Sequence, residues 1–376
     1  MRRFLVIASA LLVLVSCAQK ENVIKIGLVA PLTGDVKTFG ESTKNGFMMA
    51  VEEANSAGGI AGKQIKVYVS DDKNDPTEAA NAGSKLINQD GVKLIVGSVS
   101  SKCSIPLSEL CEGMGAVMIT PTSTATKVTV REDGSRKALI FRACFIDPFQ
   151  GAVAAKFALD NLKAKTSAIL YDVSNDYVKG LAEFYRDSFT KGGGTVVGYE
   201  SYAKDDPDFS AILTKVKREN PDILYIPDYY NKVALIAKQA RQLGIKSIFM
   251  GGDGWDSPEM IKIAGDAIEG GYFTNHYSPE DPRPEVQAWV KKYEAQFGAK
   301  PDALATLAYD ATHLLIEGVK KAGSDEPARV RDALQAIEKK AVSGDVTFDQ
   351  SGNPIKSAAI LKYTKTGQEY VATVKP

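Results

Sequence analysis

The chain has 376 residues, and its 46 lysines and arginines balance 46 aspartates and glutamates, so the formal net charge is zero. At roughly 100–200 residues per domain, this length predicts two or three domains. A composition of 44% hydrophobic and 24% charged residues excludes a disordered or fibrous chain. Because the charge is balanced, we expect no nucleic-acid partner.

The first residues have the pattern of a secretory leader. The chain starts Met-Arg-Arg and continues with an apolar run over residues 4–15, which Ser16 and Cys17 follow. The run is too short for a transmembrane helix, which needs about 20 residues, so we predict a signal peptide over residues 1–16. The letters Leu-Val-Ser-Cys resemble the lipobox of bacterial lipoproteins. This implies that Cys17 carries a lipid anchor outside the cytoplasm, with residues 17–23 as a linker. The alternative is an ordinary signal peptide with an incidental cysteine.

After the leader, β-rich segments alternate with segments of helical pattern. The expected strands cover residues 24–29, 65–69, 93–96, 116–120, 167–171, 195–199, 223–226 and 247–250. The expected helices cover residues 41–57, 76–89, 178–190, 208–219 and 231–243. Asp75-Pro76 is a helix-start signal, and residues 358–363 and 370–374 are expected to form a C-terminal hairpin. The alternation predicts an α/β fold of mostly parallel sheets flanked by helices.

The two halves of the body repeat one pattern. Asp75-Pro76 precedes a helix and a strand, and so does Asp206-Pro207. No linker rich in proline or in serine and glycine separates the halves, so we expect two similar lobes that share several crossovers. The candidate crossovers lie near residues 142–148, 272–279 and 348–355. The predicted lobe limits are 24–143 with 278–350 for lobe 1, and 148–275 with 351–376 for lobe 2.

The sequence contains no motif of catalytic chemistry. The run Gly192-Gly193-Gly194 lies between a helix and a strand, where it ends the helix, and no GxSxG, HExxH or CxxC spacing occurs. His313 lies in an apolar helical stretch, as structural histidines do, and His276 lies at a candidate crossover. We therefore expect no enzyme, and no metal or cofactor site.

Small hydroxyl residues gather at two expected strand ends. Ser-Val-Ser-Ser at residues 98–101 follows one strand, and Thr-Ser-Thr-Ala-Thr at residues 122–126 follows the next. In open α/β sheets ligands bind beyond the carboxyl ends of the strands, and hydroxyl and N–H groups at a helix N-terminus suit a carboxylate. The alternative is ordinary helix capping by serine and threonine.

Several motifs along the chain together suggest a family. They include Pro31-Leu32-Thr33-Gly34, Asn45-Gly46, Glu53-Ala54-Asn55, Phe141-Arg142, Gln150-Gly151, Lys238-Gln239-Ala240-Arg241 and Tyr309-Asp310-Ala311. With this set, the sequence from Ile24 to Phe348 resembles the periplasmic branched-chain (leucine/isoleucine/valine) amino-acid-binding proteins, the solute receptors of ABC importers. The resemblance implies the type 1 periplasmic binding protein fold, in which two Rossmann-like lobes joined by three crossovers close on the ligand.

The same resemblance implies partners. We expect a periplasmic monomer that binds a small apolar or branched-chain amino acid and delivers it to permease subunits of an ABC transporter in the membrane. The alternative is a receptor of the same fold that senses a ligand and signals to a partner.

The family's site for the ligand carboxylate can be transferred to this sequence. By the resemblance, Ser101 and Thr124 bind the carboxylate, and Ser100 and Ser123 beside them belong to the expected site.

The family's site for the ligand ammonium transfers in the same way. The backbone carbonyl of Thr122 is expected to receive the ammonium. Asp253 falls where the leucine receptors carry a glutamate that pairs with the ligand ammonium. Aspartate keeps the negative charge of that glutamate, but its side chain is shorter. Tyr177 and Tyr229 match tyrosines that close over the ligand from lobe 2.

The expected pocket for the ligand side chain is apolar. Phe39, Val99 and Leu304 fall on its positions, which favours an apolar ligand side chain. Trp255 is expected to shape the same pocket.

The cysteines depart from the family pattern. The leucine receptors carry a disulfide whose cysteines align with Asn74 and Ser100. Cys103 and Cys111 are eight residues apart in an expected helix, about 12 Å along its axis, whereas a disulfide needs Cα atoms within about 7 Å. Cys144 could pair with either of them; the alternative is three small buried thiols.

Overall fold

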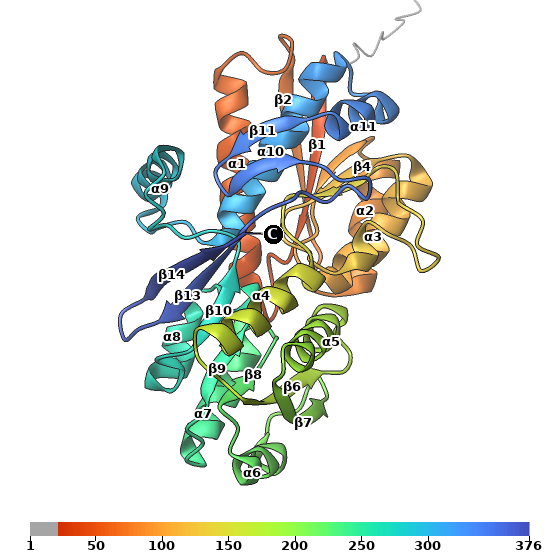
Figure 1. Ribbon diagram of the computed structural model, residues 1–376. Coiled ribbons are helices and arrows are strands. Elements are labelled where there is room, and N and C mark those ends of the chain that lie inside the picture. Colours follow the sequence, from red (N-terminus) through yellow and green to blue (C-terminus); the bar gives the residue numbers. More distant parts are fainter. Residues whose placement is uncertain (1–21, 376) are drawn as a thin grey trace, which may run out of the picture.

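The computed structural model describes residues 22–375, which form two α/β lobes stacked end to end (Figure 1). The predicted signal peptide over residues 1–16 and the predicted lipid site at Cys17 lie outside the described residues. Within residues 22–375 no helix has the length and apolar character needed to cross a membrane.

Lobe 1 is built on a five-stranded parallel sheet. Its strand order is β2 (Gln64–Asp71), β1 (Val23–Ala30), β3 (Leu94–Val96), β4 (Val117–Thr120) and β5 (Ile140–Arg142). Its helices are α1 (Lys37–Ser56), α2 (Pro76–Asn88), α3 (Ser101–Met114), α9 (Pro284–Phe297), α10 (Ala303–Ala322) and α11 (Pro327–Gln335).

Strand side chains of lobe 1 alternate between two cores. Leu28 joins the core that contains Phe47 of α1 and Leu307 of α10, whereas its neighbour Val29 joins the core that contains Leu107 of α3. Successive strand residues point to opposite faces, so the sheet is buried on both sides by helices.

Lobe 2 is built on a seven-stranded mixed sheet. Its order is β14 (Gln368–Val374), β13 (Ala358–Tyr363), β10 (Tyr272–Asn275), β9 (Ile248–Gly251), β8 (Ile223–Tyr225), β6 (Thr166–Asp172) and β7 (Thr195–Tyr202). β13 runs antiparallel to both of its neighbours, β10 and β14, and the other pairs among the described strands are parallel. Its helices are α4 (Asp147–Asp160), α5 (Asp176–Lys191), α6 (Ser210–Glu219), α7 (Tyr230–Gln242) and α8 (Glu259–Ala264).

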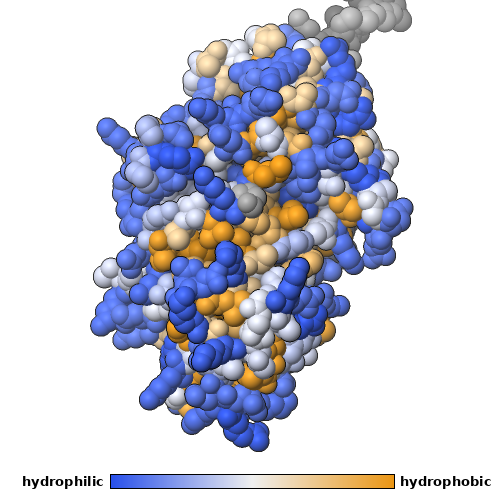
Figure 2. Space-filling model, viewed as in Figure 1, coloured by the Kyte–Doolittle hydropathy of each residue, from blue (hydrophilic) through white to orange (hydrophobic). Residues whose placement is uncertain are grey.

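Three crossovers join the lobes. The chain passes from β5 to α4, from β10 to α9, and from the hairpin of β11 (Glu338–Ala341) and β12 (Gly344–Thr347) to β13. Lys356 in the third crossover is buried; its Nζ donates to the Ala143 carbonyl of the first crossover at 3.0 Å and bonds the Ser343 hydroxyl. Burial lowers the pKa of Lys356 to about 8. Hydrophobic residues concentrate around this middle region in the face shown in Figure 2.

The predicted two-lobed α/β architecture is confirmed, and so is the C-terminal hairpin. Asp75 starts α2 as expected: its carboxylate accepts from the N–H groups of Thr77 and Glu78 at 2.8 and 3.0 Å, with Pro76 at the first helical position. The first helix begins at Lys37, four residues before the expected start. The residue limits of the lobes stay a prediction.

Gly46 permits a close approach of α1 to α10. A Cβ at this position would lie 1.9 Å from the Ala305 carbonyl oxygen. We expect Gly46→Ala to lower the free energy of unfolding by about 1–3 kcal/mol, because the added methyl must push the two backbones apart.

Gly113→Ala is the matched control, since a Cβ at Gly113 meets nothing within 4 Å. On the helix α3 this change should be neutral or stabilising by up to about 1 kcal/mol. Urea unfolding measures both variants, and equal stabilities would contradict the close approach.

Candidate functional site

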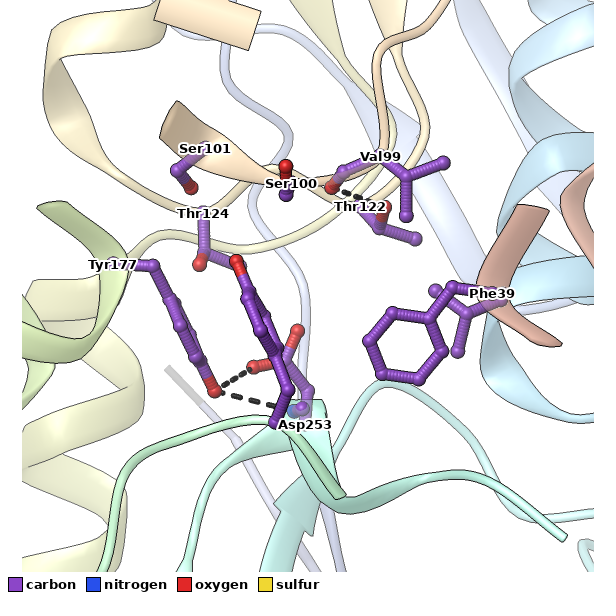
Figure 3. Close-up of a pocket in the computed structure, with 11 residues that line it drawn as sticks. Phe39, Val99, Ser100, Ser101, Thr122, Thr124, Tyr177 and Asp253 are labelled. Atoms are coloured by element: carbon purple, nitrogen blue, oxygen red, sulfur yellow. Dashed lines mark hydrogen bonds between the residues drawn. The ribbon is translucent and has the colours of Figure 1, made fainter. Parts of the chain in front are cut away.

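A cavity of about 310 Å³ lies between the two lobes, at the carboxyl ends of strands from both sheets (Figure 3). Lobe 1 contributes Phe39, Val99, Ser100, Ser101, Thr122, Thr124 and Leu304, and lobe 2 contributes Tyr177, Tyr229, Asp253 and Gly254. The lining combines polar groups with aromatic and aliphatic side chains, as ligand pockets do.

Hydroxyl groups interlock the two loops that form the lobe 1 wall. Thr122 Oγ1 donates to the Val99 carbonyl at 2.8 Å, and Thr120 Oγ1 donates to the Ser98 carbonyl at 2.7 Å. The loop after β3 is thereby fixed to the loop after β4.

Two hydroxyls of this wall are free to donate to an anion. Ser101, the first residue of α3, accepts at Oγ from the Ala125 N–H at 3.2 Å, which leaves its own hydrogen unused. Thr124 is 1% exposed, and its Oγ1 makes no hydrogen bond of normal geometry within the described chain. A buried hydroxyl without a partner is costly, and a ligand oxygen would satisfy it.

Arg142 lies beneath the same wall. Its buried guanidinium donates to the carbonyls of Ser123 at 2.7 Å and Ala125 at 2.9 Å, so it holds the two residues that flank Thr124. Burial lowers the pKa of this guanidinium, and its charge adds to the positive end of the α3 dipole. The lobe 1 wall therefore favours a carboxylate.

Asp253 gives the lobe 2 wall the opposite character. Its Oδ1 accepts from Gln150 Nε2 at 2.8 Å and from the Tyr177 hydroxyl at 2.9 Å, and its Oδ2 lies 3.0 Å from His276 Nε2. Its side chain is 12% exposed. The carboxylate is thus held by side chains from α4, α5 and the segment after β10, and it faces the cavity.

Local sequence explains how these partners reach Asp253. Asn175 caps α5 by accepting from the Tyr177 N–H at 3.2 Å, which sets Tyr177 in the first turn of the helix. A Cβ at Gly252 would lie 2.6 Å from the Tyr177 hydroxyl oxygen and 2.9 Å from Gln150 Nε2. Only glycine leaves both donors room to approach the neighbouring carboxylate.

Aromatic rings form the remaining wall. Tyr177 and Tyr229 stack with centroids 5.4 Å apart and an interplanar angle of 4°, and Phe39 of lobe 1 meets Tyr229 edge-on at 5.7 Å. Burial raises the pKa of both tyrosines well above its usual value, so they remain neutral. With Val99 and Leu304, these rings give the cavity an apolar side.

A second buried carboxyl lies behind the cavity. Burial raises the pKa of Asp147 to about 8; the Thr124 hydroxyl partly opposes this rise and the charge of Asp253 adds to it. Asp147 is therefore neutral at pH 7.

The structure brings ten of the eleven expected site residues to the cavity wall. Ser123 lies behind the wall: its hydroxyl donates to the Val99 carbonyl at 2.9 Å and bonds Ser104 Oγ at 2.7 Å. The ligand contacts themselves stay predictions. Sequence reasoning missed Gly254, and it missed Gln150 and His276 as partners of Asp253.

Trp255 does not line the cavity, contrary to expectation. The indole is fully buried in lobe 2, where Nε1 donates to the Ile226 carbonyl at 2.9 Å and the ring stacks on Phe273. A Cβ at Gly251 would lie 2.2 Å from Nε1. Only glycine at this position leaves space for the indole in the core of lobe 2.

Cys103, Cys111 and Cys144 are all free and buried, so the pairing left open for Cys144 does not form. Burial raises the pKa of each thiol to about 12. Ser100 Oγ donates to Asn74 Oδ1 at 2.7 Å, at the two positions where the resembled family carries its disulfide. Within residues 22–375, no cluster of side chains could hold a metal ion.

Known proteins resemble this chain over most of its length. The profile of the periplasmic binding protein family matches residues 23–368. The leucine-, isoleucine-, valine-, threonine- and alanine-binding protein of Pseudomonas aeruginosa is 35% identical over 339 residues, 90% of this chain and 89% of the relative. The Leu/Ile/Val-binding protein of Escherichia coli is 32% identical over 333 residues, 88% of each chain.

Solved structures of amino-acid-binding proteins resemble the fold of this chain. A leucine-binding protein, LivK, from Thermotoga maritima superposes with a TM-score of 0.89 at 36% identity, covering 94% of this chain and 99% of that one. The branched-chain amino acid transporter substrate-binding protein LivJ from Streptococcus pneumoniae, in complex with isoleucine, gives 0.88 at 31% identity, covering 94% and 100%. These relatives are binding proteins rather than enzymes. The chain belongs to the periplasmic binding protein family, whose members work outside the cytoplasm.

Proposed function

We propose that this member of the periplasmic binding protein family is the solute-binding receptor of an ABC importer. It captures a small apolar or branched-chain amino acid between its lobes and delivers it to a membrane permease. The observation that carries the proposal is Asp253, a nearly buried carboxylate whose three hydrogen-bond partners, Gln150, Tyr177 and His276, are neutral donors. A buried charge without a counter-ion is unfavourable, and a ligand ammonium supplies that counter-ion.

The rest of the cavity fits an α-amino acid. The free hydroxyls of Ser101 and Thr124 face the carboxylate of such a ligand across the cavity from Asp253. The apolar side formed by Phe39, Val99 and Leu304 takes its side chain. The relatives named above, which bind leucine, isoleucine or valine, support the same ligand class.

Ligand capture closes the lobes. Residues 24–143 with 278–350 move as one body, and residues 148–275 with 351–376 move as the other. Direct contacts across the cleft include Thr38 Oγ1 with Ser257 Oγ at 3.2 Å and the Tyr230 hydroxyl with the Asp35 carbonyl at 3.3 Å. A ligand that touches both walls binds the closed state more tightly and shifts the population toward it.

The protein acts as a monomer tethered to the membrane by a lipid on Cys17, which keeps it close to the permease. Cys17→Ser should abolish membrane attachment without changing ligand affinity, because the described fold begins after the linker. Fractionation of cells that express each form measures this. Wild-type protein found entirely in the soluble fraction would contradict the anchor.

Asp253→Asn should weaken the binding of leucine by at least about a hundredfold, since loss of one partner of a buried ion pair costs roughly 3–5 kcal/mol. The matched 2-keto acid lacks the ammonium and should lose much less affinity. Isothermal titration calorimetry measures both ligands.

Asp266→Asn is the control for Asp253→Asn, because it removes one charge from an exposed position of the same lobe. It should leave both affinities unchanged. Equal binding of leucine by Asp253→Asn and wild type would overturn the proposed ammonium site.

Thr124→Val should weaken leucine binding about tenfold or more, because a hydrogen bond to a charged group contributes about 1.5–3 kcal/mol. Within the described chain Thr124 Oγ1 makes no hydrogen bond of normal geometry, and its other effect is to oppose the rise in the pKa of Asp147. Thr43→Val is the matched control: Thr43 is equally buried, its Oγ1 also lacks a partner among residues 22–375, and it does not line the cavity. Affinities that fall equally in both variants would contradict a specific contact.

A further inference from the structure

His276 contacts the Asp253 carboxylate from the second crossover between the lobes. It directly follows β10 at the start of the second crossover, and its Nε2 lies 3.0 Å from Asp253 Oδ2. The side chain is 1% exposed. Its ring packs on Phe145 of the first crossover with centroids 3.8 Å apart and an interplanar angle of 30°. Packing therefore fixes the ring in one orientation toward the carboxylate.

The surroundings keep the His276 ring neutral. An ionised carboxylate only accepts hydrogen bonds, so Nε2 carries the hydrogen that points at Asp253. Nδ1 is buried and has no partner within the described chain, so a second proton there would be a buried donor without an acceptor. Burial lowers the pKa of His276, and Asp253 partly opposes this.

Other charged groups also face the ring. Lys356 of the third crossover opposes its protonation, and Asp256, in the same loop as Asp253, favours it. Asp147, at the start of α4, interacts with Asp253, but its pKa of about 8 keeps it protonated below pH 7. Because His276 Nε2 lies 3.0 Å from Asp253 Oδ2, a change of charge on the ring acts directly on that carboxylate.

On the basis of the amino-acid function proposed above, we propose that His276 positions the ammonium-binding carboxylate of Asp253, and that a proton on its ring competes with the ligand ammonium for that carboxylate. As a neutral donor, the ring orients Oδ2 and leaves the full negative charge for the ligand. As a cation, the ring pairs with Oδ2 itself. The ligand ammonium then meets a carboxylate that is already neutralised, beside a second positive charge.

The competition has a definite sign. Because the proton and the ligand each weaken the binding of the other, ligand binding expels the proton. Affinity for an amino acid therefore falls as the pH drops through the pKa of His276 in the free protein, by at most about tenfold per pH unit. A ligand without an ammonium makes no ion pair with Asp253. Its affinity should therefore not show this fall toward acid pH.

The experiment compares wild type with His276→Gln and His276→Leu by isothermal titration calorimetry. The probes are leucine and its 2-keto acid, 4-methyl-2-oxopentanoate, between about pH 5 and pH 7.5, the range in which histidine titrates. The His276→Gln variant keeps a neutral hydrogen-bond donor at this position, and the His276→Leu variant keeps only a side chain of similar size. Asp72 and Asp228, whose pKa values burial raises to about 6, titrate in the same range, so the difference between variants isolates the histidine.

We expect wild-type affinity for leucine to fall toward acid pH, and the His276→Gln variant to lose that part of the fall while it still binds leucine at neutral pH. His276→Leu should bind leucine about tenfold more weakly at neutral pH and should bind the keto acid as wild type does. An identical pH profile in wild type and His276→Gln, or unchanged leucine affinity in His276→Leu, would overturn the role of His276 alone. A wild type that binds no amino acid would overturn the proposed function with it.

Discussion

The site depends on one buried carboxylate that is hydrogen-bonded but not paired with a cation. Gln150, Tyr177 and His276 reach the Asp253 carboxylate from three different elements. Such dipoles stabilise a charge only if the scaffold holds them in place. Much of the local structure serves this: the Asn175 cap places Tyr177, Gly252 gives the donors room, and Trp255 turns away beside Gly251.

The wall that lobe 1 contributes has the opposite polarity to Asp253. The α3 N-terminus, the hydroxyls of Ser101 and Thr124, and the Arg142 guanidinium beneath them all favour negative charge. In the function proposed above, each lobe holds half of the site for a zwitterion. Because the two halves meet only across the cleft, ligand recognition and closure of the lobes are then one process.

The sequence was sufficient for the parts of the structure that local chemistry determines. Asp75-Pro76 predicted the start of α2, and alternating β-rich and helical segments predicted the sheets, because capping and periodicity act within a few residues. The partners of Asp253 could not be derived, since Gln150 and His276 lie 103 and 23 residues away and meet it only through packing. Trp255 was misplaced for the same reason: proximity in the chain did not indicate which way the ring turns. Gln150-Gly151 was among the family motifs, yet a motif does not say what its side chain contacts.

The hydrogen bond between Ser100 and Asn74 has a consequence for how the protein is made. It fastens the start of α3 to the loop before α2, with no covalent bond, and the three described thiols are buried and un-ionised. The fold described by residues 22–375 therefore needs no thiol oxidase or disulfide isomerase after export. Because these residues contain no disulfide that a strong reductant could break, we expect the ligand cavity to form equally well in a reducing and in an oxidising envelope.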